Sequence, residues 1–283
     1  MTVIQTKNVT YTYPGATKPS ISDVSINIEK GQFTLITGPS GCGKTTLCRC
    51  FNGLIPHFYL GEMKGEIIVA GLGVTEHTTA ELARHVGLVF QNPENQLFAL
   101  SVEKDVAFGL ENLGVPREEM RDRVDWALKL TGIYDLRERP PHELSGGQQQ
   151  RVAIASVLAM KPEVIVLDEP TSFLDPLSAK KIFEVIYDLN KRFGVTIVLI
   201  EHRLDLTARY ANHLIIMDEG KVVLDGDSRE ILCSEEARLI GVGIPKATRL
   251  FQMLEKDGAI CGDTIPLSSD EMATLLKEAL TRR

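Results

Sequence analysis

The sequence has few cysteines, no long hydrophobic run and no excess of positive charge. Its five cysteines form no CxxC pair and its six histidines show no metal-ligand spacing, so neither a disulfide framework nor a zinc site is expected, and a reducing compartment fits best. The longest aliphatic runs, such as Val164–Leu167, are far shorter than the roughly 20 apolar residues of a membrane helix. The first residues lack the basic and apolar blocks of a signal peptide. The net charge of −7 gives the whole chain no bias toward nucleic acid.

The chain has 283 residues, of which 43% are hydrophobic, and this composition is typical of a globular protein with a sizeable core. Short apolar segments predict buried strands at Phe33–Thr37, Val164–Leu167 and Val195–Ile200. Helical patterns separate the strands, so the sequence predicts an α/β core with a mostly parallel sheet. The alternation of Val3–Tyr11 predicts a half-buried strand, and with Val24–Ile28, another expected strand, it suggests an N-terminal antiparallel β subdomain.

The middle of the chain is mostly helical. From Val102 to Leu136 the apolar residues recur at helical spacing with charges between them, and Pro140–Pro141 ends the pattern. We predict a helical insert over about 92–160, within a domain that spans 1–239. Residues 240–283 predict short helices that form a small C-terminal extension.

A phosphate-binding loop follows the strand Phe33–Thr37. It matches the pattern GxxxxGK(S/T) at every fixed position. Glycines let backbone amides converge on an anion, and the helix that begins near Lys44 adds its positive end. Lys44 can reach the terminal phosphates of ATP, and the Thr45 hydroxyl can bind Mg²⁺. The nucleotide-binding residues are Gly38, Pro39, Ser40, Gly41, Cys42, Gly43, Lys44 and Thr45, with Thr46 next in the helix.

Two carboxylates end the apolar strand Val164–Leu167. Asp168 at the strand tip can hold the magnesium shell, and Glu169 stands where it can polarise a water for attack on the γ-phosphate. Alone, the pair could be two solvated acids after a core strand. Together with the phosphate-binding loop, it predicts a hydrolytic site.

A second glycine-rich turn, Leu144–Gln148, stands directly before a predicted helix. Ser145 and the amides of Gly146 and Gly147 can donate to phosphate oxygens, with Gln148 beside them. One triphosphate does not need two such cradles from one chain. We therefore expect this cradle to serve a nucleotide that another subunit binds.

With these motifs the chain resembles the nucleotide-binding subunits of ABC transporters over roughly residues 3–230, and Leu144–Gln148 resembles that family's signature motif. The resemblance implies two ATPase subunits arranged head to tail. Each ATP is then held by the phosphate-binding loop of one subunit and the signature turn of the other, and closure of the pair moves a membrane partner.

The resemblance also implies roles for single residues. Tyr13 resembles the aromatic residue that stacks on adenine, and Gln91 resembles the glutamine that touches magnesium and the attacking water. Asp175 resembles the aspartate that links the two active sites, and His202 resembles the histidine that contacts the γ-phosphate. Lys44, Gln91, Glu169 and His202 are thus the expected catalytic residues, and Thr45, Gln91 and Asp168 the expected metal ligands, with ATP and Mg²⁺ as cofactors.

Two positions depart from the family pattern. Phe173 stands where a small residue is commoner, which puts the packing of its loop in doubt. Glu201 precedes His202 where the family more often has a small polar residue, and the run Glu-His-Arg is similar to that of one subgroup.

The segment Gln91–Gly109 resembles the ATPases of energy-coupling-factor importers, which take up vitamins or transition-metal ions such as cobalt and nickel. The resemblance implies three partners: a second ATPase subunit, identical or paralogous, a transmembrane coupling protein and a substrate-binding membrane protein. It places the chain at the cytoplasmic face of the membrane. It also implies that residues 240–283 help two ATPases stay together.

Two other classes of function compete with this interpretation. A soluble ATPase of the same fold could act on DNA or ribosomes, but the roughly 100 residues between Thr45 and Leu144 show no sustained heptads and the chain has one ATPase core. A regulatory protein could sense ATP without hydrolysing it, but Glu169 and His202 argue against that.

Overall fold

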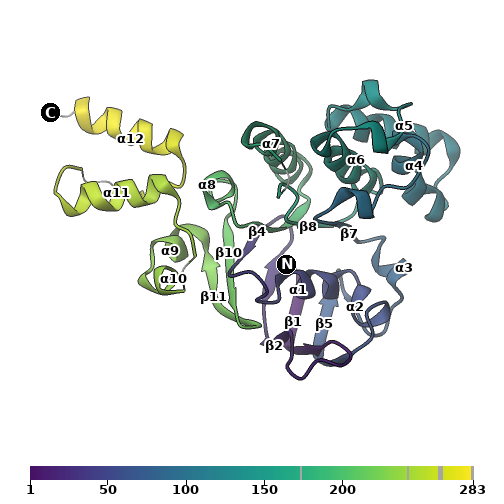
Figure 1. Cartoon of the computed structure of the whole chain (residues 1–283), viewed down its shortest axis with the longest axis horizontal. Coiled ribbons are helices and arrows are strands. Elements are labelled where there is room, and N and C mark those ends of the chain that lie inside the picture. Colours follow the sequence, from purple (N-terminus) through teal and green to yellow (C-terminus); the bar gives the residue numbers. More distant parts are fainter. Residues whose placement is uncertain (173, 241, 261–263, 282–283) are drawn as a thin grey trace.

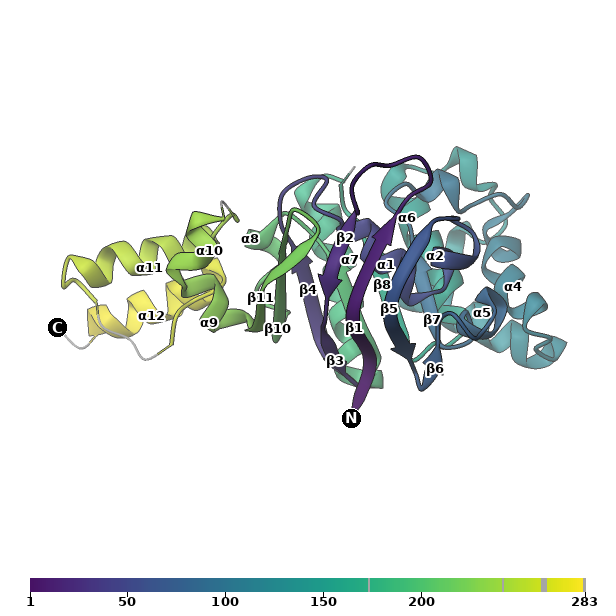
Figure 2. The ribbon, with the colours of Figure 1, turned by 90° about the horizontal axis from the view of Figure 1, so that it is seen from below.

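A computed structural model describes residues 1–172, 174–240, 242–260 and 264–281. Two β-sheets form its centre. Helices α4, α5 and α6 lie at one end of the molecule and α11 and α12 at the other (Figure 1), and the perpendicular view in Figure 2 shows the same arrangement. The fold is therefore a mixed α/β core with a helical insert and a helical C-terminal extension, as predicted.

The larger sheet is the predicted parallel sheet. Its order is β11-β10-β4-β9-β8-β7, and only β11 is antiparallel to its neighbour. The turn of the β10–β11 hairpin, Glu219–Gly220, has positive φ at both residues (44° and 79°), which suits a tight two-residue turn. The strands are β4 (Phe33–Thr37), β7 (Val86–Val89), β8 (Val164–Asp168), β9 (Thr196–Ile200), β10 (His213–Asp218) and β11 (Lys221–Asp227).

The smaller sheet is antiparallel and is built from the N-terminal strands. Its order is β2-β1-β5-β6, with β3 also paired with β1. The strands are β1 (Thr2–Thr12), β2 (Ile21–Val24), β3 (Asn27–Glu29), β5 (Glu62–Val69) and β6 (Leu72–Gly73).

One predicted strand, Val24–Ile28, is wrong as a continuous element. Between β2 and β3, two backbone groups of this strand bond to the Thr6 side chain of β1 instead of to its backbone. The Thr6 hydroxyl accepts from the Ile26 amide (2.9 Å) and donates to the Val24 carbonyl (3.0 Å). The two short strands therefore share β1 without forming one continuous strand.

Helices cover both faces of the parallel sheet and form the insert and the extension. The helices are α1 (Lys44–Phe51), α2 (Leu54–His57), α3 (Thr79–Leu82), α4 (Val102–Asn112), α5 (Arg117–Leu130), α6 (Gly146–Ala159), α7 (Pro176–Phe193), α8 (Leu204–Thr207), α9 (Ser228–Cys233), α10 (Glu235–Leu239), α11 (Lys246–Lys256) and α12 (Ser269–Thr281). Short 3-10 turns lie at Pro93–Asn95, Tyr134–Leu136 and Pro141–Glu143. Within the described residues, no helix is both long and apolar enough to span a bilayer.

Each face of the parallel sheet belongs to a different hydrophobic core. On β8, Val164 and Val166 join the core that contains α1 and the N-terminal sheet, whereas Ile165 and Leu167 join the core that contains α6 and α7. Both faces are buried, which explains why the strand is apolar throughout. The carboxyl ends of β4, β8 and β9 therefore lie at one edge of a rigid sheet.

Ion pairs connect the C-terminal extension to the core. Arg209, after α8, pairs with Asp270 of α12 (3.0 Å), and Arg229 of α9 pairs with Glu271 (3.0 Å). The amide of Lys246 donates to the Asp205 carboxylate (2.7 Å). These contacts hold α11 and α12 against one end of the parallel sheet.

Candidate nucleotide site

The loop between β4 and α1 requires glycine at two positions. Gly38 has φ +144°, and a Cβ there would lie 2.0 Å from the Met217 carbonyl oxygen. Gly43 has φ +101°, and a Cβ there would lie 2.4 Å from the Ser20 carbonyl oxygen. The conformation and the close approach of neighbouring backbone exclude any larger residue. The loop therefore brings its amides together at the first turn of α1.

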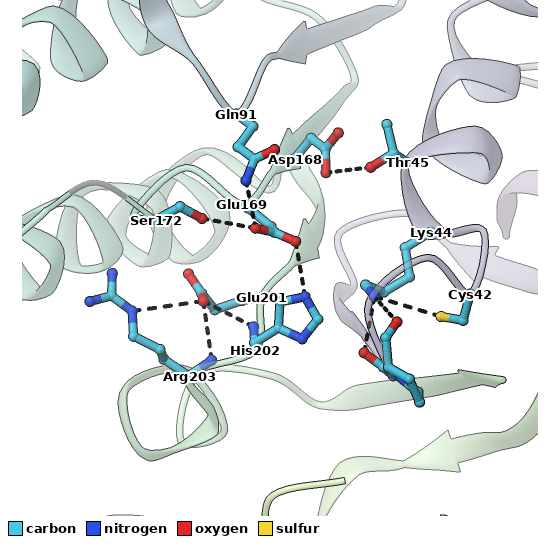
Figure 3. A network of polar contacts seen from close by, with 12 residues as sticks. Cys42, Lys44, Thr45, Gln91, Asp168, Glu169, Ser172, Glu201, His202 and Arg203 are labelled. Carbon is cyan, nitrogen blue, oxygen red and sulfur yellow. Dashed lines mark hydrogen bonds and ion pairs between the residues drawn. The ribbon is translucent and has the colours of Figure 1, made fainter.

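Lys44 lies over this loop as a buried cation. Its Nζ donates to the carbonyl oxygens of Gly38 (3.0 Å) and Pro39 (2.8 Å), and the Cys42 sulfur lies 3.6 Å away (Figure 3). No acidic residue occupies the first turn of α1. The lysine charge and the helix N-terminus therefore act together on an anion at this loop.

Thr45 and Asp168 bring two kinds of oxygen ligand together. The Thr45 hydroxyl donates to Asp168 Oδ1 at 3.2 Å, which joins the first turn of α1 to the end of β8. Asp168 is only 6% exposed. Burial raises the pKa of the Asp168 carboxyl, although the Thr45 hydrogen bond opposes the rise. A carboxylate desolvated in this way is suited to binding a cation.

The described residues contain no group of three or more His, Cys, Asp and Glu side chains that could hold a metal. A hydroxyl and a single carboxylate instead suit magnesium, which keeps several waters and takes further ligands from substrate phosphates. Thr45 and Asp168 therefore fit a Mg²⁺–nucleotide complex better than a resident metal ion.

Glu169 is the point where three segments meet. Its Oε2 accepts from Gln91 Nε2 (2.9 Å) and from Ser172 Oγ (2.9 Å), and its Oε1 lies 2.9 Å from His202 Nε2 (Figure 3). The backbone of Glu169 has φ 46°, a rare conformation for a residue with a side chain, and its amide donates to the Ile200 carbonyl (3.1 Å). Gln91, Glu169 and His202, separated by up to 111 positions in the sequence (202 − 91), thus face one another. The catalytic roles expected of them stay predictions. No role for Ser172 follows from the sequence, although its place three residues after Glu169 could have suggested one.

Tyr13 lies beside the first turn of α1. Its hydroxyl is 3.3 Å from Thr46 Oγ1 and accepts from Arg49 Nη1 (3.3 Å). Its ring packs edge-to-face with those of Tyr11 and Tyr59, at 4.8 and 6.2 Å between centroids. The N-terminal sheet therefore brings an aromatic ring to the phosphate-binding loop.

The signature turn Leu144–Gln148 caps α6, as expected. Gln148 Oε1 accepts from the Ser145 amide (2.9 Å) and the Ser145 hydroxyl (3.2 Å), so these two side chains fix the helix N-terminus. No hydrogen bond or ion pair joins this turn to the phosphate-binding loop in the part of the chain that the structure describes. The turn lies beside the segment that follows Glu169, because a Cβ on Gly147 would be 3.5 Å from Leu174 Cδ2.

Asp175 caps α7. Its Oδ1 accepts from the amides of Leu177 and Ser178, both at 3.0 Å, and hydrogen bonding with Ser178 lowers the pKa of this carboxyl. Phe173, whose packing was in doubt, lies outside the described residues. Ser172 therefore belongs to the Glu169 cluster, and Asp175 lies at the N-terminus of α7.

Comparisons with known proteins agree with this geometry. A family model described as ABC transporter matches residues 21–172. The energy-coupling factor transporter ATP-binding protein EcfA1 of Caldanaerobacter subterraneus is 45% identical over 261 residues, 90% of this chain and 92% of that protein.

Two solved structures have the same fold. CbiO1 of Clostridium perfringens, part of the ABC transporter complex cbiONQ, is 35% identical with a TM-score of 0.75, over 90% of this chain and 99% of that one. A dimeric ATP-binding cassette with ADP and phosphate bound is 31% identical with a TM-score of 0.70, over 80% of this chain and 99% of that one. The chain belongs to the ABC transporter family, as an ATP-binding subunit with ATPase activity.

Proposed function

We propose that this ATPase powers an energy-coupling-factor importer and transmits the state of its active site to a membrane partner through the segment after Gln91. One observation carries the proposal. Phe98 and Leu100 are 65% and 81% exposed, and they follow closely after Gln91, whose amide donates to Glu169. A partner bound to this apolar segment could therefore influence the catalytic carboxylate directly.

The exposed segment has a fixed shape, which favours specific docking. Asp105 of α4 accepts hydrogen bonds from the amides of Phe98 (3.1 Å) and Ala99 (3.2 Å). The ring of Phe98 packs edge-to-face on Phe108, which is 43% exposed, at 4.7 Å between centroids. Exposed apolar side chains held in a fixed arrangement are what the apolar face of a partner helix can bind.

The nucleotide is held from three sides. Amides of the loop 38–45 and the Lys44 ammonium bind the phosphates, Thr46 assists at the first turn of α1, and Tyr13 stacks on the adenine. Thr45, Asp168 and Gln91 would hold Mg²⁺. When bound, magnesium would supply positive charge that stabilises the transferring phosphoryl group.

Glu169 orients and polarises the attacking water, and its partners keep it in place. His202 and Gln91 donate to different oxygens of the carboxylate, which leaves lone pairs available for a water hydrogen. His202 also contacts the γ-phosphate, so catalysis is mostly electrostatic and positional.

Two subunits complete each site. The amides of Gly146 and Gly147, with Ser145 and Gln148, bind the phosphates of a nucleotide on the partner subunit, and Asp175 links the two sites. The pairing has support at the other end of the chain, where the extension exposes apolar side chains: Leu250 (43%), Met253 (58%) and Leu280 (72%). We propose that residues 240–283 contribute to this contact.

The cargo is a vitamin or a transition-metal ion. A substrate-binding membrane protein selects it, and a transmembrane coupling protein connects that protein to the ATPase pair. The chain then works at the cytoplasmic face of the membrane.

Replacement of Asp168 by Asn should separate metal binding from folding. Because burial raises the pKa of this carboxyl, its charged form costs stability as pH rises through the folded-state pKa. The nucleotide-free Asp168→Asn protein should therefore have a higher unfolding midpoint at pH 7, and the difference should shrink toward pH 4. ATP turnover with Mg²⁺ should fall at least tenfold. The control Asp188→Asn, at a half-exposed carboxylate of α7 that pairs with Arg192 at the surface, should change neither quantity appreciably.

Replacement of Glu169 by Gln should retain ATP binding and reduce turnover by about 100-fold or more, because loss of a general base costs that much. ATP should then trap a closed pair, visible by size-exclusion chromatography. The matched control is Glu163→Gln, which changes a carboxylate at the opposite edge of the sheet that pairs with Lys30 and His85. Hydrolysis at the wild-type rate in Glu169→Gln would refute the assigned role.

Replacement of Ser145 by Arg should block the second half of the site. Equilibrium binding of ATP to the isolated subunit should be unchanged, whereas turnover should be abolished. Thr78→Arg is the matched control, because Thr78 caps α3 in the same type of capping box. Loss of ATP binding by the isolated Ser145→Arg subunit would show that the site is not shared between two chains.

Replacement of Leu100 by Asp should prevent assembly with the membrane partner, since it places a charge on the apolar segment. Co-expression with membrane proteins encoded by neighbouring reading frames, followed by affinity purification, measures this. We expect recovery of the partners to fall at least tenfold. Val223→Asp, at another exposed apolar residue, should leave recovery unchanged. Undiminished recovery with Leu100→Asp would exclude this surface.

A further inference from the structure

A buried carboxylate lies directly beside the Glu169 cluster without touching Glu169. Glu201 follows β9 and precedes His202, and only 2% of its surface is exposed. A carboxylate loses its hydration on burial, so its position depends on the hydrogen bonds that replace the water. Its partners therefore show what it does.

Each oxygen of Glu201 binds a different segment. Oε2 accepts from the Thr171 hydroxyl at 2.5 Å, and Thr171 is itself fully buried. Oε1 accepts from the amides of His202 (2.9 Å) and Arg203 (3.1 Å). One carboxylate thus joins Thr171 to the backbone that carries His202. Figure 3 shows the contacts of Glu201 with His202 and Arg203.

Arg203 makes the reciprocal connection. Its guanidinium donates to the carbonyl oxygens of Thr171 and Leu174, the latter at 3.3 Å, and its Nε lies 3.8 Å from Glu201 Oε1. The backbone carbonyls of Thr171 and Leu174 are therefore held by one planar cation. A lysine could not make both contacts from one rigid group.

The two connected segments approach the same catalytic carboxylate. Ser172, next to Thr171, donates to Glu169 Oε2, and His202, next to Glu201, lies against Oε1. Leu174 lies beside Gly147 of the signature turn, and Asp175 caps α7. A shift of either segment would change the direction of Glu169, and active sites tolerate only about 0.5 Å of such displacement.

We propose that Glu201 and Arg203 are positioning residues that make Thr171, Ser172 and Leu174 move together with the His202 segment. The pair transmits displacement of the His202 segment to Asp175 and the signature turn, and thus to the site shared with the second subunit. The inference rests on the roles proposed for Glu169 and the shared site. It explains why a glutamate and an arginine flank His202 where Glu201 departs from the family pattern.

The test removes the connection at Thr171, which touches no reacting group. Thr171→Val deletes the hydroxyl at nearly constant volume, and Thr171→Ser keeps it. We expect Thr171→Val to lower kcat at least tenfold with the ATP dissociation constant of the subunit unchanged within twofold, and Thr171→Ser to stay within twofold of wild type. Thr34→Val is the control, because Thr34 is equally buried and bonds His213 at 3.0 Å in the interior of the sheet.

The pair Glu201→Gln and Thr171→Val tests whether the two residues act together. If they form one connection, the double variant should lose no more activity than the worse single variant, whereas independent losses would multiply. Three outcomes would each overturn the proposal. Thr171→Val could turn over ATP at the wild-type rate, or the double variant could lose the product of the two single losses. Thr171→Val could also lose no more kcat than a Thr34→Val variant that is equally destabilised. A failure of Glu169→Gln to lose turnover would refute the proposed catalytic site instead, so the two failures are distinguishable.

Discussion

The geometry of the candidate site depends on how the Glu169 carboxylate is held. Glu169 sits in a strained backbone conformation at the end of a buried strand, and donors from three separate segments fix its two oxygens. None of these segments could fix it alone, because Gln91, Ser172 and His202 all stand in loops. The parallel sheet supplies the rigidity, since β7, β8 and β9 end side by side and bring the loops together.

The same edge of the sheet joins the residues proposed for nucleotide binding to those proposed for hydrolysis. Thr45 and Asp168 join the phosphate-binding loop to the strand that carries Glu169. In the proposed mechanism, a nucleotide at the phosphate-binding loop would therefore lie one hydrogen bond, Thr45 to Asp168, from the strand that precedes Glu169. Binding energy can be used in this way to align the water rather than only to retain the substrate.

Much of this arrangement follows from the sequence because the signals are local. The boundaries of β8 and β9 agree with the apolar runs to within one residue, since strands buried on both faces have no polar positions. The phosphate-binding loop and the signature turn are equally local, because glycine and helix capping act over a few residues. The break between β2 and β3 was missed because it depends on the Thr6 side chain, which is about 20 positions away.

The roles of Glu201 and Ser172 were missed for a related reason. The sequence shows that Glu201 is unusual, but its partner Thr171 is 30 residues away and becomes a neighbour only when β8 and β9 pair. A buried acid in a loop has no periodic pattern that would indicate its function. Side chains that connect loops can therefore be inferred only from the fold, whereas side chains that touch the nucleotide are tied to recognisable local motifs. His202 belongs to both groups of residues. Its position after β9 identifies it as a motif residue, and its backbone amide donates to Glu201, which connects the two loops.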